Sequence, residues 1–447
     1  MRIQIAEPEA FTTLLIKQFG KSPASPITGI STDSRECQVG DLYIALKGER
    51  SDGHQFIQQA MENGAVACLA DREVPVKNRT DLFVVESPLR TLGSLAKSYR
   101  KLFQIPVIGI TGSNGKTSTK ELLKHIFSTR ENVHATTGNF NTSIGLPLTL
   151  FQISYDHSIS IIEMGANQPG DIAYLCSIAV PTLGLITNIT PAHLEGFGTI
   201  AEVAKTKGAL FKSLTEGTAF VNNADDLIRE LEVVGERISY GITPDCDFPA
   251  DIHHEKNGSI TVTIDTQEIA TGSHNLSFIK NVIAASAVCI HLGIDWKTFE
   301  TQVQSFQSPQ GRCEVKQIDN ITIIDDTYNA NLTSTMAAID YLKAFSGNGR
   351  RIFVFGDMFE LGGESLSHHR KVGEHCSEMN LDAVFTIGDN TRETDNAIDS
   401  NIFHKHFASK GELVSELKEW IKEGDKLLVK GSRGMSMESI LEDLEAN

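Results

Sequence analysis

Short apolar runs and amphipathic helical stretches alternate along most of this chain. The clearest change of pattern lies between residues 105 and 127. Residues 107–110 form an apolar run of the length that a buried parallel strand needs. From residue 116 onward, apolar side chains recur at the 3.6-residue spacing of one helix face. The pattern predicts a strand, a short break and a helix in that order.

The break between this strand and helix has the composition of a phosphate-binding loop. It reads TGSNG over residues 111–115 and is followed by Lys116 and Thr117. Backbone N–H groups and a helix N-terminus can face a phosphate, a lysine can reach its outer oxygens, and a threonine hydroxyl can hold Mg²⁺. The general motif has a glycine where Ile110 stands. A glycine turn with an exposed lysine is the plainer interpretation, but the flanking strand and helix favour a site for ATP or GTP.

The segment before this motif predicts a small α/β unit over residues 1–104. Its expected elements are helices at 10–19, 55–62 and 89–103, with strands at 42–46, 66–69 and 82–86. Ser34, Arg35 and Lys47 lie in turn-rich stretches. Taken alone, they are explained as turn polar groups and solvated charges.

Residues 105–310 predict a central nucleotide domain with further polar groups at strand ends. A strand at 158–162 ends at Glu163, and a strand at 183–189 is followed by His193. A carboxylate at the tip of a strand beside a phosphate loop is suited to Mg²⁺. A lone histidine is more often a core or surface group than a ligand, so both interpretations of His193 stay open at this point.

Lys207 stands out because it interrupts an apolar helical stripe. In the stretch 200–211 the apolar residues fall on one helix face, and Lys207 lies in the middle of it. A lysine there is costly unless it is paired, reaches solvent or is chemically altered. Lys205 and Lys212 lie off the stripe and are expected at the surface. Lys207 is therefore expected to have a partner.

Residues 311–447 predict a third α/β unit with a parallel, Rossmann-like sheet. Its strands are expected at 321–325, 352–355, 383–387 and 426–429, with helices between them. Polar segments follow these strands: DDTYNAN (325–331), GDMFELG (356–362) and KGSRGMSME (430–438). The ordinary polarity of loops explains any one of these segments. Three such segments at the strand ends, where open α/β sheets bind ligands, favour a ligand-binding site.

Composition limits the class of protein and its partners. A length of 447 residues allows two to four domains, and a formal charge of −17 argues against nucleic acid or an anionic membrane as partner. No apolar run approaches a membrane span, and the first residues do not have the pattern of a signal peptide. The seven cysteines stand singly, which suggests reduced thiols in a cytoplasm.

Taken together, the motifs resemble those of the Mur ligase family of ATP-dependent amide ligases. They run in the family's order over nearly the whole chain: STDSR (31–35), ALKG (45–48), TGSNGKTS (111–118), TTGNFNTSIGLP (136–147), EMGAN (163–167), TNITPAHLEGFG (187–198), AKTKGALF (204–211), GSHN (272–275), GRCE (311–314) and the three segments after the C-terminal strands. Three positions depart from the usual pattern: Thr142 stands for Asn, Gln168 for His and Leu332 for Pro.

The resemblance implies three α/β domains and a specific reaction. They are a small N-terminal domain for the UDP-sugar (1–104), a central P-loop-type mononucleotide-binding domain that binds ATP and carries out catalysis (105–310), and a mobile C-terminal Rossmann-like domain (311–447). The partners implied are ATP, UDP-N-acetylmuramoyl-tripeptide and D-Ala-D-Ala. ATP would phosphorylate the tripeptide carboxylate, and the dipeptide amine would attack the acyl phosphate. The protein is expected to act as a cytoplasmic monomer in cell-wall precursor synthesis.

The resemblance also assigns roles to residues. Lys116, Glu163, His193 and Lys207 would be catalytic. Two Mg²⁺ ions would be held by Thr117, Glu163, His193 and Lys207, the last as a carbamate formed with CO₂. The residues implied to bind ATP are Thr111, Gly112, Ser113, Asn114, Gly115, Lys116, Thr117, Ser118, Asn281, Arg312, Asp326 and Asn329. Those implied to bind the other substrates are Ser34, Arg35, Lys47, Thr137, Asn139, Asn141, Ser432 and Arg433.

Three alternatives remain. The nearest is another ligase of the same superfamily, such as a folylpolyglutamate synthase or an earlier Mur ligase. A regulatory P-loop switch would bind nucleotide but need no second or third substrate site. A scaffold protein would leave Lys207 on its apolar stripe unexplained.

Overall fold

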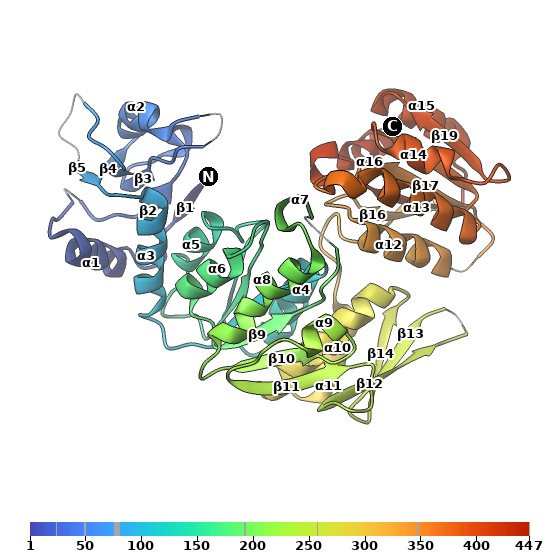
Figure 1. Cartoon of the computed structure of the whole chain (residues 1–447), viewed down its shortest axis with the longest axis horizontal. Helices are drawn as coiled ribbons and strands as arrows, with labels where there is room; N and C mark the ends of the chain where they lie inside the picture. Colours follow the sequence, from blue (N-terminus) through green and yellow to red (C-terminus); the bar gives the residue numbers. More distant parts are fainter. Residues whose placement is uncertain are drawn as a thin grey trace.

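The computed structural model describes residues 1–23, 25–48, 51–75, 81–191, 194–256, 258–345 and 347–446. These residues form three sheets, each flanked by helices and arranged one after another along the chain (Figure 1). Within the described ranges, no helix combines the length and apolar character needed to cross a membrane. All seven cysteines are free thiols.

The N-terminal domain is built on a five-stranded sheet in the order β1-β2-β3-β4-β5, parallel except for the pair β1–β2. Its elements are β1 (Arg2–Gln4), α1 (Pro8–Phe19), β2 (Gly29–Ser31), η1 (Ser34–Glu36), β3 (Asp41–Ile44), η2 (Gly53–Phe56), α2 (Ile57–Glu62), β4 (Ala65–Ala70), β5 (Asp81–Val84) and α3 (Pro88–Arg100). The predicted helices and strands of this unit are present, with ends shifted by a few residues.

The central domain contains a nine-stranded sheet in the order β14-β13-β12-β11-β10-β9-β6-β8-β7. Its first part comprises β6 (Val107–Thr111), α4 (Lys116–Phe127), β7 (Val133–Ala135), α5 (Gly145–Leu150), β8 (Ile159–Glu163), α6 (Asp171–Ala179), β9 (Leu183–Ile186), α7 (Leu194–Phe197) and α8 (Ile200–Ser213). The remainder comprises β10 (Thr218–Asn222), α9 (Asp226–Arg229), β11 (Glu236–Gly241), β12 (Phe248–His254), β13 (Ile260–Ile264), β14 (Gln267–Ser273), α10 (Leu276–His291) and α11 (Trp296–Ser305).

Two apolar cores sandwich the parallel part of the central sheet. The apolar faces of α4 and α10 pack on one side, and those of α5, α6 and α8 pack on the other. The second core is continuous with that of the N-terminal domain: Phe11 and Tyr99 stack edge-on against Phe151, and Tyr99 Oη donates to Ile153 O over 2.8 Å. The first two domains therefore share one apolar core.

The C-terminal domain contains a six-stranded sheet in the order β15-β16-β20-β17-β18-β19, parallel except for the pair β15–β16. Its elements are β15 (Glu314–Ile318), β16 (Ile321–Asp326), α12 (Leu332–Ala344), β17 (Arg351–Gly356), η3 (Gly362–Glu364), α13 (Ser365–Glu378), β18 (Ala383–Ile387), α14 (Thr391–Asn396), β19 (Phe403–Phe407), α15 (Lys410–Trp420), β20 (Lys426–Lys430), η4 (Arg433–Met435) and α16 (Glu438–Glu445). Apolar residues of α12 and α13 cover one face, and those of α15 and α16 the other.

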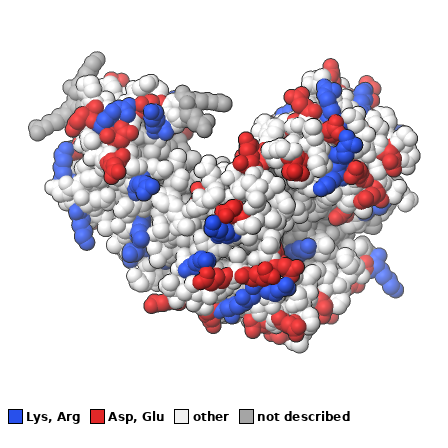
Figure 2. All heavy atoms as spheres, viewed as in Figure 1, with Lys and Arg blue, Asp and Glu red and all other residues white. Residues whose placement is uncertain are grey.

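The fold class expected from the sequence is confirmed: three α/β units, the last with a mostly parallel sheet. Seen from the side of Figure 2, the surface is hollowed between the N-terminal and C-terminal domains, with acidic and basic side chains interspersed over both. Several of the functional groups named from the sequence lie at the carboxyl ends of parallel strands, among them the phosphate loop after β6, Glu163 at the end of β8 and Asp326 at the end of β16.

Candidate active site

The loop between β6 and α4 is held in shape by the neighbouring strand end. Thr111 Oγ1 donates to Met164 O over 2.9 Å, and Ser113 N donates to Asn188 O over 2.9 Å. Gly112 has a φ of +149°, and a Cβ there would lie 1.9 Å from Thr187 Oγ1. Only glycine fits this position, because both its backbone angle and its contact exclude a side chain.

Lys116 and Lys207 meet beneath this loop. Lys116 Nζ donates to Gly112 O over 2.7 Å, and Lys207 Nζ donates to the same oxygen over 3.1 Å. Lys207 is only 2 % exposed, as its place on the apolar face of α8 predicts. Its partner is this carbonyl; across the described residues no carboxylate forms an ion pair with it.

Burial sets the protonation tendencies of both lysines. Burial lowers the pKa of Lys116, Glu163 opposes that shift, and Arg312 adds to it. Burial holds the pKa of Lys207 well below its ordinary value, and the charge of Lys116 acts in the same direction. Burial of two amines so close together disfavours the protonated form of each, so an anion bound at this loop would stabilise either ammonium group.

Thr117 and Glu163 form a pair of hard oxygen donors. Thr117 Oγ1 donates to Glu163 Oε2 over 2.9 Å, and Asn141 Nδ2 donates to Glu163 Oε1 over 2.7 Å. Glu163 is 2 % exposed, and in the resolved part of the chain no lysine or arginine forms an ion pair with it. A buried carboxylate without a cation, next to a threonine hydroxyl, fits Mg²⁺. The described residues hold no cluster of three or more His, Cys, Asp or Glu side chains suited to a metal.

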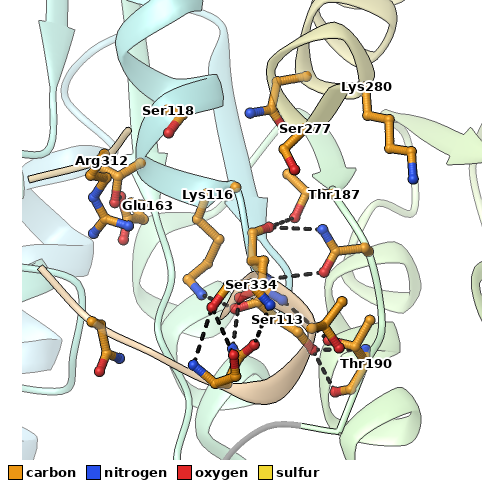
Figure 3. A pocket seen from close by; sticks show the side chains of 18 of the residues that line it. Ser113, Lys116, Ser118, Glu163, Thr187, Thr190, Ser277, Lys280, Arg312 and Ser334 are labelled. Atoms are coloured by element: carbon orange, nitrogen blue, oxygen red, sulfur yellow. Dashed lines mark hydrogen bonds between the residues drawn. The ribbon is translucent and has the colours of Figure 1, made fainter. Parts of the chain in front are cut away.

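A cavity of about 840 Å³ opens over these groups and extends to the C-terminal domain. The phosphate loop, Glu163, Asn139, Asn141 and α10 line it from the central domain. Arg312, Asp326, Asn329 and Lys430 line it from the other side. In Figure 3, Arg312 and Glu163 lie to one side of Lys116, with Thr187 and Ser277 on the other. The cavity therefore brings together groups from two domains.

Asn281 and Arg312 are fixed beside the loop by different contacts. Gly115 has a φ of +80°, and a Cβ there would lie 2.7 Å from Asn281 Oδ1, so Asn281 packs directly against the loop. The Arg312 guanidinium lies over the Tyr328 ring at 4.0 Å from its centroid. That stacking is a cation–π contact, and it holds Arg312 at the cavity wall.

An ion pair between a buried lysine and a partly exposed aspartate supports the segment after β16. Lys430 is 1 % exposed; its Nζ forms an ion pair with Asp326 and donates to Asn329 O over 2.9 Å. Asp326 Oδ1 also accepts from Cys313 N over 3.1 Å. Lys430 thus fixes Asp326 and Asn329, the two residues of this segment that the family resemblance implies bind ATP.

The remaining site residues named from the sequence lie elsewhere. Ser34 is buried, and its Oγ donates to Gln59 Oε1 over 2.8 Å. The exposed Arg35 forms an ion pair with Asp33. These two residues and Lys47 belong to the N-terminal domain and do not line the cavity. Thr137 is exposed beside the cavity-lining Asn139 and is not part of the wall.

Two C-terminal residues and one histidine complete the set. Ser432 Oγ accepts from Phe359 N over 2.8 Å, and Arg433 Nη1 donates to Glu438 Oε1 over 2.9 Å. Neither lines the cavity. His193 lies outside the described residues.

Several residues that shape the site were not predicted from the sequence. Asn188 contacts the phosphate loop, Lys430 pairs with Asp326, and Asn331 Nδ2 donates to Asn114 Oδ1 over 2.7 Å. All three stand within the motifs that follow strands. A cation directly after the apolar run 427–429 was the available signal for Lys430.

Three family profiles match the chain in sequence. They are the Mur ligase family catalytic domain over residues 26–108, the Mur ligase middle domain over 110–289, and the Mur ligase glutamate ligase domain over 311–433. Together they account for most of each of the three α/β units.

Curated relatives and solved structures match over nearly the full length. A UDP-N-acetylmuramoyl-tripeptide–D-alanyl-D-alanine ligase of Haemophilus influenzae is 36 % identical over 436 residues, which is 93 % of each chain. The enzyme of that name from Escherichia coli is 35 % identical, covering 94 % of each chain.

The crystal structure of MurF from Acinetobacter baumannii aligns with a TM-score of 0.89 at 30 % identity, covering 98 % of each chain. MurF ligase from Thermotoga maritima in complex with ADP aligns with a TM-score of 0.82 at 32 % identity, covering 93 % of this chain and 96 % of that one. With such agreement in sequence, order of domains and fold, the chain belongs to the Mur ligase family.

Proposed function

We propose that this protein joins D-Ala-D-Ala to UDP-N-acetylmuramoyl-tripeptide at the expense of ATP, giving the pentapeptide, ADP and phosphate. The observation that carries the proposal is the cavity shared by two domains, with the phosphate loop, Lys116 and Glu163 on one wall and Arg312 on the other. The buried Lys207 lies beneath the loop, where it donates to Gly112 O as Lys116 does. The names of the full-length relatives support this choice of substrates. Family membership argues against the switch and the scaffold, neither of which forms a bond.

The central problem of such a reaction is charge. The tripeptide carboxylate must approach the γ-phosphate of ATP, and both are anions. Lys116 and Arg312 supply positive charge at the phosphate loop and on the opposite wall of the cavity. Such preorganised cations stabilise the charge of phosphoryl transfer without solvent reorganisation. The transfer gives an acyl phosphate, and the dipeptide amine then displaces phosphate and forms the amide.

The metal site belongs to the proposal as well. Thr117 and Glu163 would hold Mg²⁺, with His193 and a carbamate of Lys207 at a second ion. Bound Mg²⁺ supplies positive charge that offsets the phosphate oxygens. Lys207 lies buried without a carboxylate partner among the described residues, a setting in which carbamylation would replace a costly cation by a ligating anion.

The remaining assignments follow the three domains. Residues 1–104 would hold the UDP-sugar through Ser34, Arg35 and Lys47. In residues 105–310, Asn281 would contact ATP, and the sugar-peptide would be held by Thr137, Asn139 and Asn141. Residues 311–447 would close over the site, with Asp326 and Asn329 on the nucleotide and Ser432 and Arg433 towards the dipeptide. Closure would keep water from the acyl phosphate. The enzyme would act as a monomer in the cytoplasm, where ATP is available.

The test is phosphate release from ATP and Mg²⁺, with each component omitted in turn. Release that requires both UDP-N-acetylmuramoyl-tripeptide and D-Ala-D-Ala, with the pentapeptide product seen by mass spectrometry, is the expected result. Release that requires a different amino acid instead would keep the mechanism and change the substrate. Release that ignores every acceptor would overturn the proposal.

A further inference from the structure

A side chain of the C-terminal domain donates a hydrogen bond directly to the phosphate loop. Asn331, the N-cap of α12, donates from Nδ2 to Asn114 Oδ1 over 2.7 Å, across 217 positions of sequence. We call this hydrogen bond the Asn114–Asn331 bridge. It brings the first turn of α12, with Ser334, to the phosphate loop beside Ser113 (Figure 3). Both residues of the bridge line the cavity.

The orientation of the Asn331 amide follows from its second task. Asn331 Oδ1 accepts from Ser334 N over 2.9 Å, and Asn331 N donates to Ser334 Oγ over 3.1 Å, which together form a capping box. Because the oxygen must face this N–H group, the amide nitrogen must face Asn114. The helix cap therefore fixes the donor of the bridge.

The acceptor is fixed just as firmly by the central domain. Asn114 Nδ2 donates to Thr190 Oγ1, so its Oδ1 is the atom that remains for Asn331. Asn114 N donates to Asn188 Oδ1 over 2.9 Å, and Asn114 O accepts from Thr187 Oγ1 and Asn188 Nδ2. Every polar group of Asn114 is thereby engaged, and a shift of α12 would act on the loop residue that precedes Gly115.

We infer that Asn331 is a positioning residue: through Asn114 it fixes the position of the phosphate loop relative to the C-terminal wall of the cavity. The inference rests on the proposed function, since it assumes that one nucleotide contacts both walls. Asn331 itself needs no contact with substrate. Its effect passes through Asn114, and its loss weakens nucleotide binding and turnover together.

The experiment is a double-mutant cycle with Asn331→Ser, Asn114→Ala and the pair combined. Serine is as good an N-cap as asparagine but is too short to reach Asn114, so this change removes the bridge and keeps the helix cap. The readouts are kcat for dipeptide-dependent phosphate release, the Kd of the non-hydrolysable analogue AMP-PNP, and Tm. Each is measured on the full chain.

The expected result is a fall in kcat and a rise in the Kd of AMP-PNP, each about 2- to 10-fold, in both single variants, the range for one lost hydrogen bond. The double variant is no worse than Asn114→Ala alone, because the same bond is missing already. Effects that multiply in the double variant, or an Asn331→Ser variant with wild-type kcat and Kd, would overturn the inference.

Two further variants separate positioning from stability. Ser409→Ala removes the N-cap of α15 in the same domain, away from the cavity; it lowers Tm but leaves kcat and Kd unchanged. If Asn331→Ser fails to fold, Asn331→Asp keeps the cap and the length but has no N–H for Asn114, and the same losses are expected. A wild-type protein that binds AMP-PNP without dipeptide-dependent turnover would refute the proposed function alone, because the cycle in Kd still tests the bridge.

Discussion

Lys116 and Lys207 donate hydrogen bonds to one backbone oxygen, Gly112 O, over 2.7 and 3.1 Å, although 91 positions separate them in sequence. One comes from the first residue of α4 and the other from the middle of α8. Gly112 O can accept from both because a backbone carbonyl oxygen has two lone pairs. The pair places two amino groups where the phosphate loop turns, and each lysine gives a separate test.

Replacing Lys116 by methionine should lower kcat for phosphate release at least about 100-fold. The change keeps the bulk of the side chain and removes the charge that faces the phosphates, and a preorganised electrostatic group of this kind contributes about 10²- to 10³-fold. Lys124→Met is the matched control, because Lys124 is exposed on the same helix. A Lys116→Met variant with kcat within 2-fold of wild type would refute the role.

Replacing Lys207 by alanine should remove most activity and allow partial recovery with millimolar formate or acetate. The reason is the proposed carbamate, whose place a small carboxylate can take. Lys205→Ala is the control, since Lys205 is on the same helix and pairs with Glu202 at the surface. Rates are compared with and without the added anion at low and ambient CO₂. Full activity of the Lys207→Ala variant at low CO₂ would contradict the carbamate.

Replacing Lys430 by methionine should destabilise the C-terminal domain by about 3 kcal/mol, the lower end of the range for a broken buried pair, because Asp326 loses its cation while only 13 % of its side chain reaches solvent. The KM for ATP should also rise, since Asp326 and Asn329 lose their anchor. Urea unfolding is followed by Trp420 fluorescence in a Trp296→Phe background, which leaves a single tryptophan.

Lys405→Met provides the comparison for this variant. It breaks the ion pair of Lys405 and Glu416, whose side chains are 46 % and 31 % exposed, and should cost no more than about 1 kcal/mol. Equal losses of stability in the two variants would show that the Lys430–Asp326 pair contributes no more to the free energy of unfolding than the exposed pair does.

Acidification should weaken the fold through His134. Its ring lies buried between Ser160 Oγ and Thr149 O, and burial lowers its pKa from 6.5 to about 3. Below pH 6.5 the unfolded chain takes up a proton that the native state refuses, so the contribution is complete above pH 6.5 and is lost as pH falls towards 3. Between pH 7.5 and 5 this histidine alone should cost about 2 kcal/mol of unfolding free energy.

The measurement for His134 is the free energy of urea unfolding at both pH values, in wild type and in His134→Gln. Glutamine cannot be protonated, so the variant should lose less stability on acidification than wild type. His254→Gln serves as the control for the same substitution at an exposed histidine. If wild type and His134→Gln lose the same unfolding free energy between the two pH values, His134 is excluded as the cause of that loss.

The family, the order of the three α/β units and the elements beside the phosphate loop follow from the sequence by itself. The phosphate loop was predictable because strand, glycines, lysine and helix are neighbours in the chain, and each obeys a local rule of backbone geometry. Lys207 was recognisable because a charge on an apolar helical stripe is a conflict visible within 12 residues. Half of the described strands were not predicted, among them β10 to β14, although Ile260, Val262 and Ile264 alternate with threonines as in a half-buried strand.

Only the tertiary structure decided which distant groups meet. Three contacts join segments between which the sequence shows no link. They are the two lysine hydrogen bonds to Gly112 O, the ion pair of Lys430 with Asp326, and the Asn114–Asn331 bridge. These contacts depend on how sheets pack and on which strand ends converge, and burial then determines how strongly each charge needs its partner. Local patterns specify the elements, whereas desolvation and geometry across domains select the contacts.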